Sequence, residues 1–104
     1  MNENVTYATL LAALGHEARL EIYRLLVRAG ENGLNVGEIG THLKMPASTL
    51  SHHLSSLVDA GLVQQHKRGR EVLNSVDFTV MRRTVSFLTD QCCIGLSVSR
   101  EDAA

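Results

Sequence analysis

The chain has 104 residues, of which 44% are hydrophobic, and a formal net charge of −1 at pH 7. This length suits a single domain with a modest core. No apolar stretch reaches membrane-spanning length, and the first residues, MNENVTYATLL, lack the basic and apolar regions of a signal peptide, so we expect a cytoplasmic protein. The two cysteines are adjacent, which excludes an extracellular disulfide framework.

The charge is unevenly distributed along the chain. Residues 1–41 and residues 71–104 each have a net charge of −2. Residues 42–70 instead carry four basic side chains against one acidic side chain, together with four of the five histidines. A basic patch on an acidic body is compatible with DNA binding, and the surrounding negative charge should limit non-specific affinity.

The first half of the chain has the apolar periodicity of helices. Apolar residues at helical spacing predict three helices, over residues 5–14, 16–29 and 36–43. Gly15 ends the first helix, and the turn-forming stretch 30–33 separates the second from the third. None of these segments carries a motif typical of catalysis.

A fourth helix follows a short turn and carries the most informative residues of the chain. Met45-Pro46 interrupts the preceding helix, because a residue before proline disfavours helical geometry and proline is favourable near a helix start. The new helix ends at Gly61, a good C-cap residue. On a wheel of about 100° per residue, its apolar seam consists of Leu50, Leu54, Leu57 and Val58.

The opposite face of this fourth helix carries hydroxyl groups, an imidazole and only one charge. A solvated helix face usually carries Glu and Lys, which are better helix formers than Ser, Thr and His. DNA binding would explain this composition, because hydroxyl and imidazole groups can contact base edges and phosphates in a DNA groove. We therefore predict DNA contacts from Ser48, Thr49, His52 and Ser56 on this face, and a further contact from Ser51 near the N-terminus of the helix.

Some residues of this helix also have other interpretations. His53 borders the apolar seam, so we expect it to be packed and hydrogen-bonded instead of reading a base. Ser48 or Thr49 lies near enough to the start to cap the helix instead of contacting DNA. For the whole face, the alternative is a solvated surface on which serine has no special role.

After the fourth helix the pattern changes to that of strands. Residues 62–67 and 71–76 are strand-compatible runs on either side of a basic turn, which predicts a hairpin. Lys67, Arg68 and Arg70 at its tip are placed to meet phosphates or the minor groove. The alternative is an ordinary exposed tip, since such tips often carry Lys and Arg.

A last helix is predicted from Phe78 to about Gln91, with Asp77 as its N-cap. We expect one domain over residues 1–96 and a disordered tail over 97–104. The resulting order is α-α-α-α-β-β-α, mainly α with a small β-hairpin, and it describes a winged helix-turn-helix. The apolar side of the last helix consists of Val80, Met81, Thr84, Val85, Phe87 and Leu88.

Several stretches of the chain match one known family. ALGHEARLEIYRLL, GLNVGEIGTHLKMPASTLSHHLSSLVDAGLV and QQHKRGREV resemble the ArsR/SmtB winged-helix repressors. FLTDQCCIG is similar to an arsenite-responsive branch of that family, whose last helix ends in a vicinal cysteine pair. The resemblance implies a homodimer, formed through the first and last helices, that represses a metal(loid)-resistance operon. It implies binding to a palindromic operator in double-stranded DNA, no enzymatic activity and no required cofactor.

Other metal sites of that family are missing from this chain. Asn35-Val36-Gly37 stands where the family's best-known sensor site places a Cys-x-Cys motif, and the last helix has no histidine for a zinc site. A third cysteine, which some arsenite sensors carry after the pair, is also lacking. The scattered histidines without an acidic partner at metal spacing are interpreted as structural or surface groups; they are His16, His42 and His66.

The pair Cys92-Cys93 is the candidate metal site. Thiolates select soft ions, and adjacent cysteines fit a tetrahedral zinc site poorly. As(III), and with it Sb(III), suits them better, since it takes three thiolates in a pyramid, with the third from glutathione or from a partner subunit. We expect release from the operator when As(III) binds this pair.

Two alternative roles for the cysteines stay open, and an enzymatic or carrier role has no support in the sequence. The pair can act as a thiol-redox or persulfide switch. It can also be inert, as small apolar residues in a constitutive DNA-binding or protein-binding winged helix. An oxidoreductase or a metalloid carrier would need a Cys-x-x-Cys motif, a cofactor loop or a catalytic base, and the sequence offers none of these.

Overall fold

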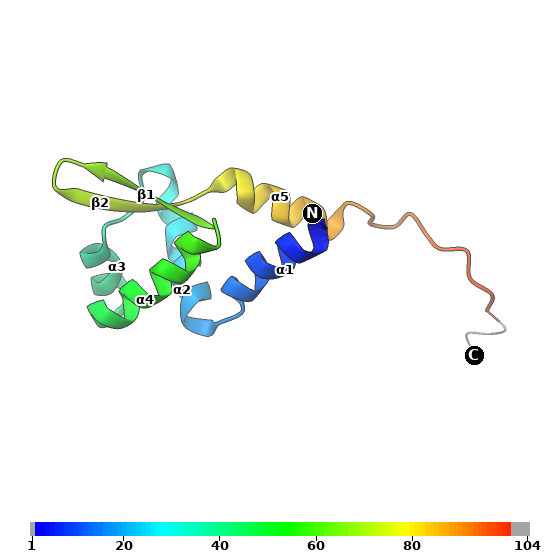
Figure 1. Cartoon of the computed structure of the whole chain (residues 1–104), viewed down its shortest axis with the longest axis horizontal. Helices are drawn as coiled ribbons and strands as arrows, with labels where there is room; N and C mark the ends of the chain where they lie inside the picture. Colours follow the sequence, from blue (N-terminus) through cyan, green and yellow to red (C-terminus); the bar gives the residue numbers. More distant parts are fainter. Residues whose placement is uncertain (1, 101–104) are drawn as a thin grey trace.

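The computed structural model describes residues 2–100 and confirms the predicted winged helix-turn-helix. Figure 1 shows the helix-turn-helix and the hairpin at one end of the molecule, with the first and last helices extending side by side at the other. The elements in chain order are α1 (Glu3–Leu14), α2 (Glu17–Ala29), η1 (Gly30–Asn32), α3 (Val36–Leu43), α4 (Ala47–Asp59), β1 (Val63–Arg68), β2 (Glu71–Val76) and α5 (Phe78–Thr89).

Side-chain caps set the boundaries of the first two helices. The Asn2 side chain accepts a hydrogen bond from the backbone N–H two residues on, so α1 begins at Glu3, earlier than the apolar pattern predicted. His16 does the same for α2, where its Nδ1 accepts from the Ala18 N–H at 3.1 Å. His16 therefore has a structural role, as predicted, and lies just outside the helix.

The core lies where α2, α3, α4 and the base of the hairpin meet. The predicted seam of α4 faces it: Leu50, Leu54 and Leu57 are at most 2% exposed, and Val58 is half-buried. Removing such side chains from water is the main stabilising contribution in a domain of this size. The other fully or nearly fully buried apolar residues of this core are Ile22, Leu26, Ile39, Leu62, Val63 and Val76.

The helices α1 and α5 bury much less. Each has one buried residue, Leu10 in α1 and Thr84 in α5. The two helices meet through a stack of the Tyr7 and Phe87 rings, whose centroids lie 4.2 Å apart. Two of the six residues on the apolar side predicted for α5 are thus uncovered within one subunit, since Val85 is 57% exposed and Leu88 is 60% exposed.

The hairpin is anchored at its base by the segment before α3. Leu34 exchanges two backbone hydrogen bonds with Asn74 of β2, at 2.9 and 2.8 Å. The fully buried Asn74 amide also donates to the Leu34 carbonyl and accepts from Gln65. This close approach requires glycine at the preceding position, because Gly33 has φ +69° and a Cβ there would overlap the Asn74 carbonyl oxygen.

The described residues after α5, 90–100, form no helix or strand. The last helix ends at Thr89, slightly before the predicted Gln91. Residues 97–100 are exposed and have no regular structure, whereas residues 101–104 of the predicted tail lie outside the described residues. The domain boundary at residue 96 stays a prediction. Among the helices described here, none is long and apolar enough to span a bilayer.

Candidate nucleic-acid interface and cysteine pair

The outer face of α4 presents most of the predicted DNA-contacting groups to solvent. Ser48, Thr49, Ser51 and His52 are exposed. Ser56 differs, because it is half-buried and its hydroxyl donates to the His52 carbonyl one turn earlier, at 3.3 Å. Its role as a DNA contact, like those of the other four, stays a prediction. The remaining groups form a contiguous hydroxyl and imidazole surface over the first turns of the helix.

The N-terminus of α4 is not closed by a side chain. Pro46 occupies the N-cap position and makes no side-chain capping bond, so neither Ser48 nor Thr49 serves as the cap that the sequence allowed. The first backbone N–H groups of an α-helix have no partner within the helix, and their partial positive charge favours anions. The start of α4 is therefore suited to a phosphate group.

A tight turn sets α4 against α3. Lys44 ends α3 in the left-handed conformation, with φ 55°, and the Met45 N–H donates back to the Gly40 carbonyl at 3.2 Å. A Cβ at Gly40 would lie 3.3 Å from the Met45 carbonyl oxygen, so a small residue helps the chain to turn here. Leu50 of α4 packs beside the same glycine. The two helices of the motif are thus held at a fixed angle.

His53 belongs to the core side of α4, which confirms the prediction that it is packed. It is 8% exposed, and its Nδ1 accepts a hydrogen bond from Arg19 Nε at 3.3 Å. The imidazole of His16 lies 4.7 Å away and that of His52 lies 5.6 Å away, measured between ring centroids. The bond from Arg19 requires that Nδ1 of His53 carry no proton.

The environment of His53 makes folding sensitive to acid. Burial lowers the pKa of His53 from its ordinary value of 6.5, and the neighbouring His16, Arg19 and His52 lower this pKa further. As the pH falls through the ordinary value, the unfolded chain takes up a proton before the folded chain does. The stability contributed by neutral His53 is therefore present above this pH and is lost as the pH falls from it towards the lowered pKa of the folded protein.

We expect the free energy of unfolding to fall between pH 7 and pH 5.5, and His53→Gln to reduce this pH dependence. Glutamine keeps an acceptor oxygen for Arg19 but does not titrate. Urea unfolding followed by circular dichroism at several pH values measures the slope. His66→Gln, at an exposed position of β1, is the control and should keep the wild-type slope. Equal slopes in both variants would contradict the role of His53.

The tip of the hairpin, or wing, projects its basic residues into solvent. Lys67, Arg68 and Arg70 are exposed. Gly69 lies between the two arginines with φ +64°, a left-handed conformation that suits a glycine in a two-residue turn. Arg68 pairs in register with Glu71, the first residue of β2. The sequence prediction of a basic tip is confirmed in position, whereas its contact with DNA stays a prediction.

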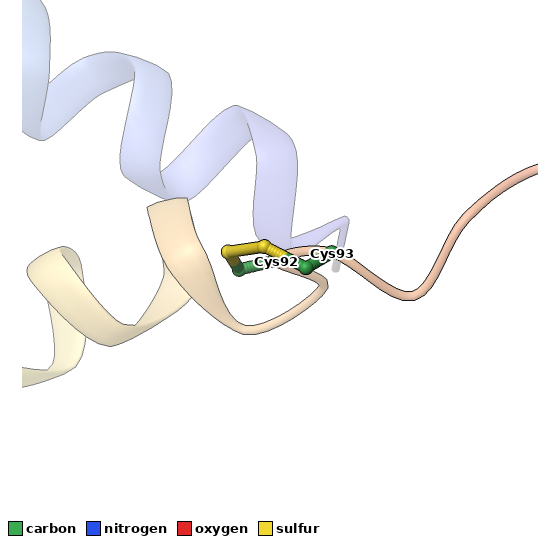
Figure 2. Close-up of a disulfide and its surroundings, with 2 residues drawn as sticks. All are labelled: Cys92 and Cys93. Atoms are coloured by element: carbon green, nitrogen blue, oxygen red, sulfur yellow. A yellow bond between two sulfur atoms is a disulfide. The ribbon is translucent and has the colours of Figure 1, made fainter.

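Cys92 and Cys93 follow α5 directly and are both exposed. Figure 2 shows their sulfur atoms joined as a vicinal disulfide, and the role of the pair as a metal site stays a prediction. The Cys92 N–H donates to the Thr89 carbonyl at 2.9 Å, so the pair is attached to the last turn of the helix. Within residues 2–100, no group of three or more His, Cys, Asp or Glu residues is arranged to hold a metal ion.

Comparison with known proteins identifies the family. A helix-turn-helix domain family matches residues 14–66, about half of the chain. An ArsR-like transcriptional regulator from Rhodococcus sp. RHA1 has the same fold, with a TM-score of 0.77 and 27% identity, over 86% of this chain and 82% of that one. The chain belongs to the ArsR family of winged-helix transcriptional regulators. This confirms the resemblance that the sequence motifs indicated.

Three further proteins of similar sequence or structure extend this comparison. The transcriptional activator HlyU of Vibrio cholerae is 33% identical over 84 residues, which cover 81% of this chain and 75% of that protein. A protein of Halobacterium salinarum named as an arsenical resistance operon repressor is 44% identical over 61 residues, which cover 59% of this chain but 46% of that protein. A homodimeric winged helix-turn-helix DNA-binding domain from Mycobacterium bovis has a TM-score of 0.66 and 25% identity, over 90% of this chain and 87% of that one.

Membership of the ArsR family settles the class of function. The chain is a DNA-binding transcriptional regulator and not an enzyme, as predicted.

Two side-chain contacts beside the interface were not predicted from the sequence. Arg19 binds His53 across 34 positions, and Asn35 binds Glu71 across 36 positions. The only sequence signal near the second contact is the spacing of Asn35 and Glu38, which is typical of a capping box.

Proposed function

We propose that this ArsR-family protein is a homodimeric repressor that binds a palindromic operator and releases it when As(III) binds Cys92 and Cys93. The observation that carries the sensor proposal is the exposed pair of adjacent sulfur atoms at the end of α5. The similarity to the Halobacterium protein named as an arsenical resistance operon repressor supports the same ligand class. A cytoplasmic location, where small thiols are abundant, belongs to this proposal.

In the proposed complex, α4 enters the major groove and the wing lies along the backbone. The exposed groups of α4 meet base edges and phosphates, and the basic wing tip meets phosphates or the minor groove. Two copies of α4 in a dimer would enter successive major grooves, about 34 Å apart. The residues proposed for these contacts are Ser48, Thr49, Ser51, His52, Ser56, Lys67, Arg68 and Arg70.

The proposed dimer forms through α1 and α5. Isolated helices of this length are marginal in water, and each of these two helices buries one residue within its own subunit. Their exposed apolar residues, Val5, Val85 and Leu88, are between 57% and 60% exposed. A second copy would cover this surface, and the Mycobacterium bovis structure of similar fold is homodimeric.

The double substitution Val85→Glu with Leu88→Glu should convert the protein to a monomer, because it places two carboxylates in the proposed interface. Operator affinity should fall by about 100-fold or more, since one subunit engages only one half-site. Sedimentation equilibrium and a fluorescence binding titration measure the two effects. Leu96→Glu, at a residue that is 90% exposed after the helix, is the control. A double variant that remains dimeric would contradict the placement of the interface.

The proposed trigger follows from the chemistry of the two thiols. As(III) forms strong bonds to soft thiolates, and two neighbouring sulfurs can chelate it while a third position is filled by glutathione or a cysteine of the partner. To shift a complex from 99:1 bound to 1:99 bound, the ligand must favour the free form by about 5.5 kcal/mol. Because the pair lies next to the proposed interface, its occupation would change the spacing of the two copies of α4.

Titration of a labelled operator complex under reducing conditions tests this proposal. As(III), and more weakly Sb(III), should release the DNA, whereas Zn(II) and Cd(II) should not. If the protein binds the operator but does not respond to As(III), the proposed sensor role is wrong and the proposed repressor role stands. A thiol-redox or persulfide response is the second candidate, since the two sulfurs lie close enough to be joined. Release by peroxide or persulfide, with no release by As(III), would support this second candidate.

A further inference from the structure

The wing is attached to the helix-turn-helix at two points along β2. The first is the pair of backbone hydrogen bonds between Leu34 and Asn74. The second is a side-chain hydrogen bond in which Asn35 Nδ2 donates to Glu71 Oε1 at 2.7 Å. Asn35 is the N-cap of α3, so this bond joins the first helix of the DNA-binding motif to the strand that leaves the wing tip.

The Asn35 side chain is already ordered before it meets the wing. Its Oδ1 accepts a hydrogen bond from the Glu38 N–H at 2.8 Å, and Glu38 Oε1 accepts from the Asn35 N–H at 2.9 Å. This reciprocal capping box fixes the amide plane and leaves Nδ2 facing Glu71. Little side-chain entropy is therefore lost when the bond to the carboxylate forms, although that carboxylate lies at the surface.

Two attachments constrain a strand in a way that one cannot. Asn74 lies three positions after Glu71, which corresponds to about 10 Å along a strand. The base of the hairpin is held in the core by Val63 and Val76, so the attachment at Glu71 acts on the tip, which a single attachment at Asn74 would leave free to bend. A two-stranded hairpin is marginally stable by itself, so its orientation depends on such contacts. Glu71 pairs with Arg68, so the second attachment lies directly beside the basic tip.

We infer that Asn35 is a positioning residue for DNA binding. Its amide holds Glu71 and thereby presents the wing tip and α4 to the operator as one rigid surface. The inference rests on the proposed function, in which Lys67, Arg68 and Arg70 contact DNA. Asn35 itself needs no contact with the nucleic acid in this arrangement.

Asn35→Asp separates this role from helix capping. Aspartate caps a helix as well as asparagine does, but it replaces the amide donor by a carboxylate that faces Glu71. We expect an unchanged midpoint of thermal unfolding, faster hydrogen exchange of the Arg68 and Arg70 amides in the free protein, and about fivefold weaker operator binding. The exchange measurement reports on the wing without any DNA.

A second substitution restores the hydrogen bond between positions 35 and 71 with donor and acceptor exchanged. In Glu71→Gln alone, the new amide oxygen still accepts from Asn35, so this variant measures only the loss of one negative charge near the tip. In Asn35→Asp combined with Glu71→Gln, the new amide donates to the new carboxylate. We therefore expect Asn35→Asp to weaken operator binding in the wild-type background and to have no effect in the Glu71→Gln background.

The outcomes distinguish this inference from the proposed function. Arg68→Ala with Arg70→Ala tests the wing contact itself and should weaken binding. If that variant weakens binding but Asn35→Asp changes neither affinity nor exchange, the inference is overturned and the proposed wing contact stands. An equal loss from Asn35→Asp in both backgrounds would also overturn it. If the arginine variant has no effect, the wing contact fails, and Asn35 does not position DNA-binding groups.

Discussion

Replacing both Cys92 and Cys93 by serine should leave operator affinity unchanged in the absence of As(III) and abolish its loss when As(III) is added. The two residues are exposed and lie after α5, away from α4 and the wing, so serine should not disturb the DNA-binding surface. Serine offers no thiolate, and As(III) has little affinity for hydroxyl groups. In the wild type we expect about 10,000-fold weaker binding with saturating As(III), which is the differential affinity of about 5.5 kcal/mol that release of the complex requires.

Single substitutions make this test sharper. Cys92→Ser and Cys93→Ser should each lose most of the response, because one remaining thiolate cannot chelate the metalloid. Fluorescence anisotropy of a labelled operator, with and without As(III) under reducing conditions, measures all four proteins. Release of the double variant by As(III) would show that the ligand binds elsewhere. Weaker operator binding by the double variant without As(III) would show that the pair also supports the DNA-binding conformation.

Gly33→Ala should lower the free energy of unfolding by about 2–4 kcal/mol. Two separate costs combine at this position. The backbone has φ +69°, which an L side chain rarely adopts, and the new Cβ would overlap the carbonyl oxygen of Asn74. To relieve the overlap, the chain must lengthen or break the backbone pair between Leu34 and Asn74 that anchors the wing. Since small domains are stable by only 5–15 kcal/mol, this loss is large.

Gly30→Ala provides the matched control for this substitution. Gly30 has φ +77°, similar to that of Gly33, but a Cβ there would meet no atom within 4 Å. Its substitution should therefore cost only the backbone strain, and the loss of stability should be smaller than for Gly33→Ala. Urea unfolding followed by circular dichroism measures both variants. Equal losses for the two glycines would show that the approach of Asn74 does not contribute to stability.

The order and bounds of the elements were predictable because their signals are local. The helix α3 begins and ends at the predicted residues, and the start of β2 also matches. Apolar spacing within eight residues determines such a segment, and the capping residue lies beside it. The beginning of α1 was misplaced for the same reason, since a polar cap at Asn2 extends the helix beyond its apolar residues.

The candidate site was predictable where a local pattern decides it, as the turn does for the wing tip and the periodicity of one helix does for α4. The angle of His53 on α4 placed it at the border of the apolar seam, and it is buried there. The angle of Ser56 placed it on the outer face but could not show that its hydroxyl donates to the backbone carbonyl of His52. The bonds from Arg19 to His53 and from Asn35 to Glu71 join residues far apart in sequence. Such pairs depend on the packed fold, which no local pattern contains.

The start of α4, where Pro46 supplies no side-chain acceptor, has a thermodynamic consequence. In the free protein only water completes the first turn of this helix. An operator phosphate would be a better acceptor than water, so the helix would reach its full order when the protein docks. Part of the interaction energy would then be used to finish local folding, and the measured affinity would be smaller than the contacts alone suggest.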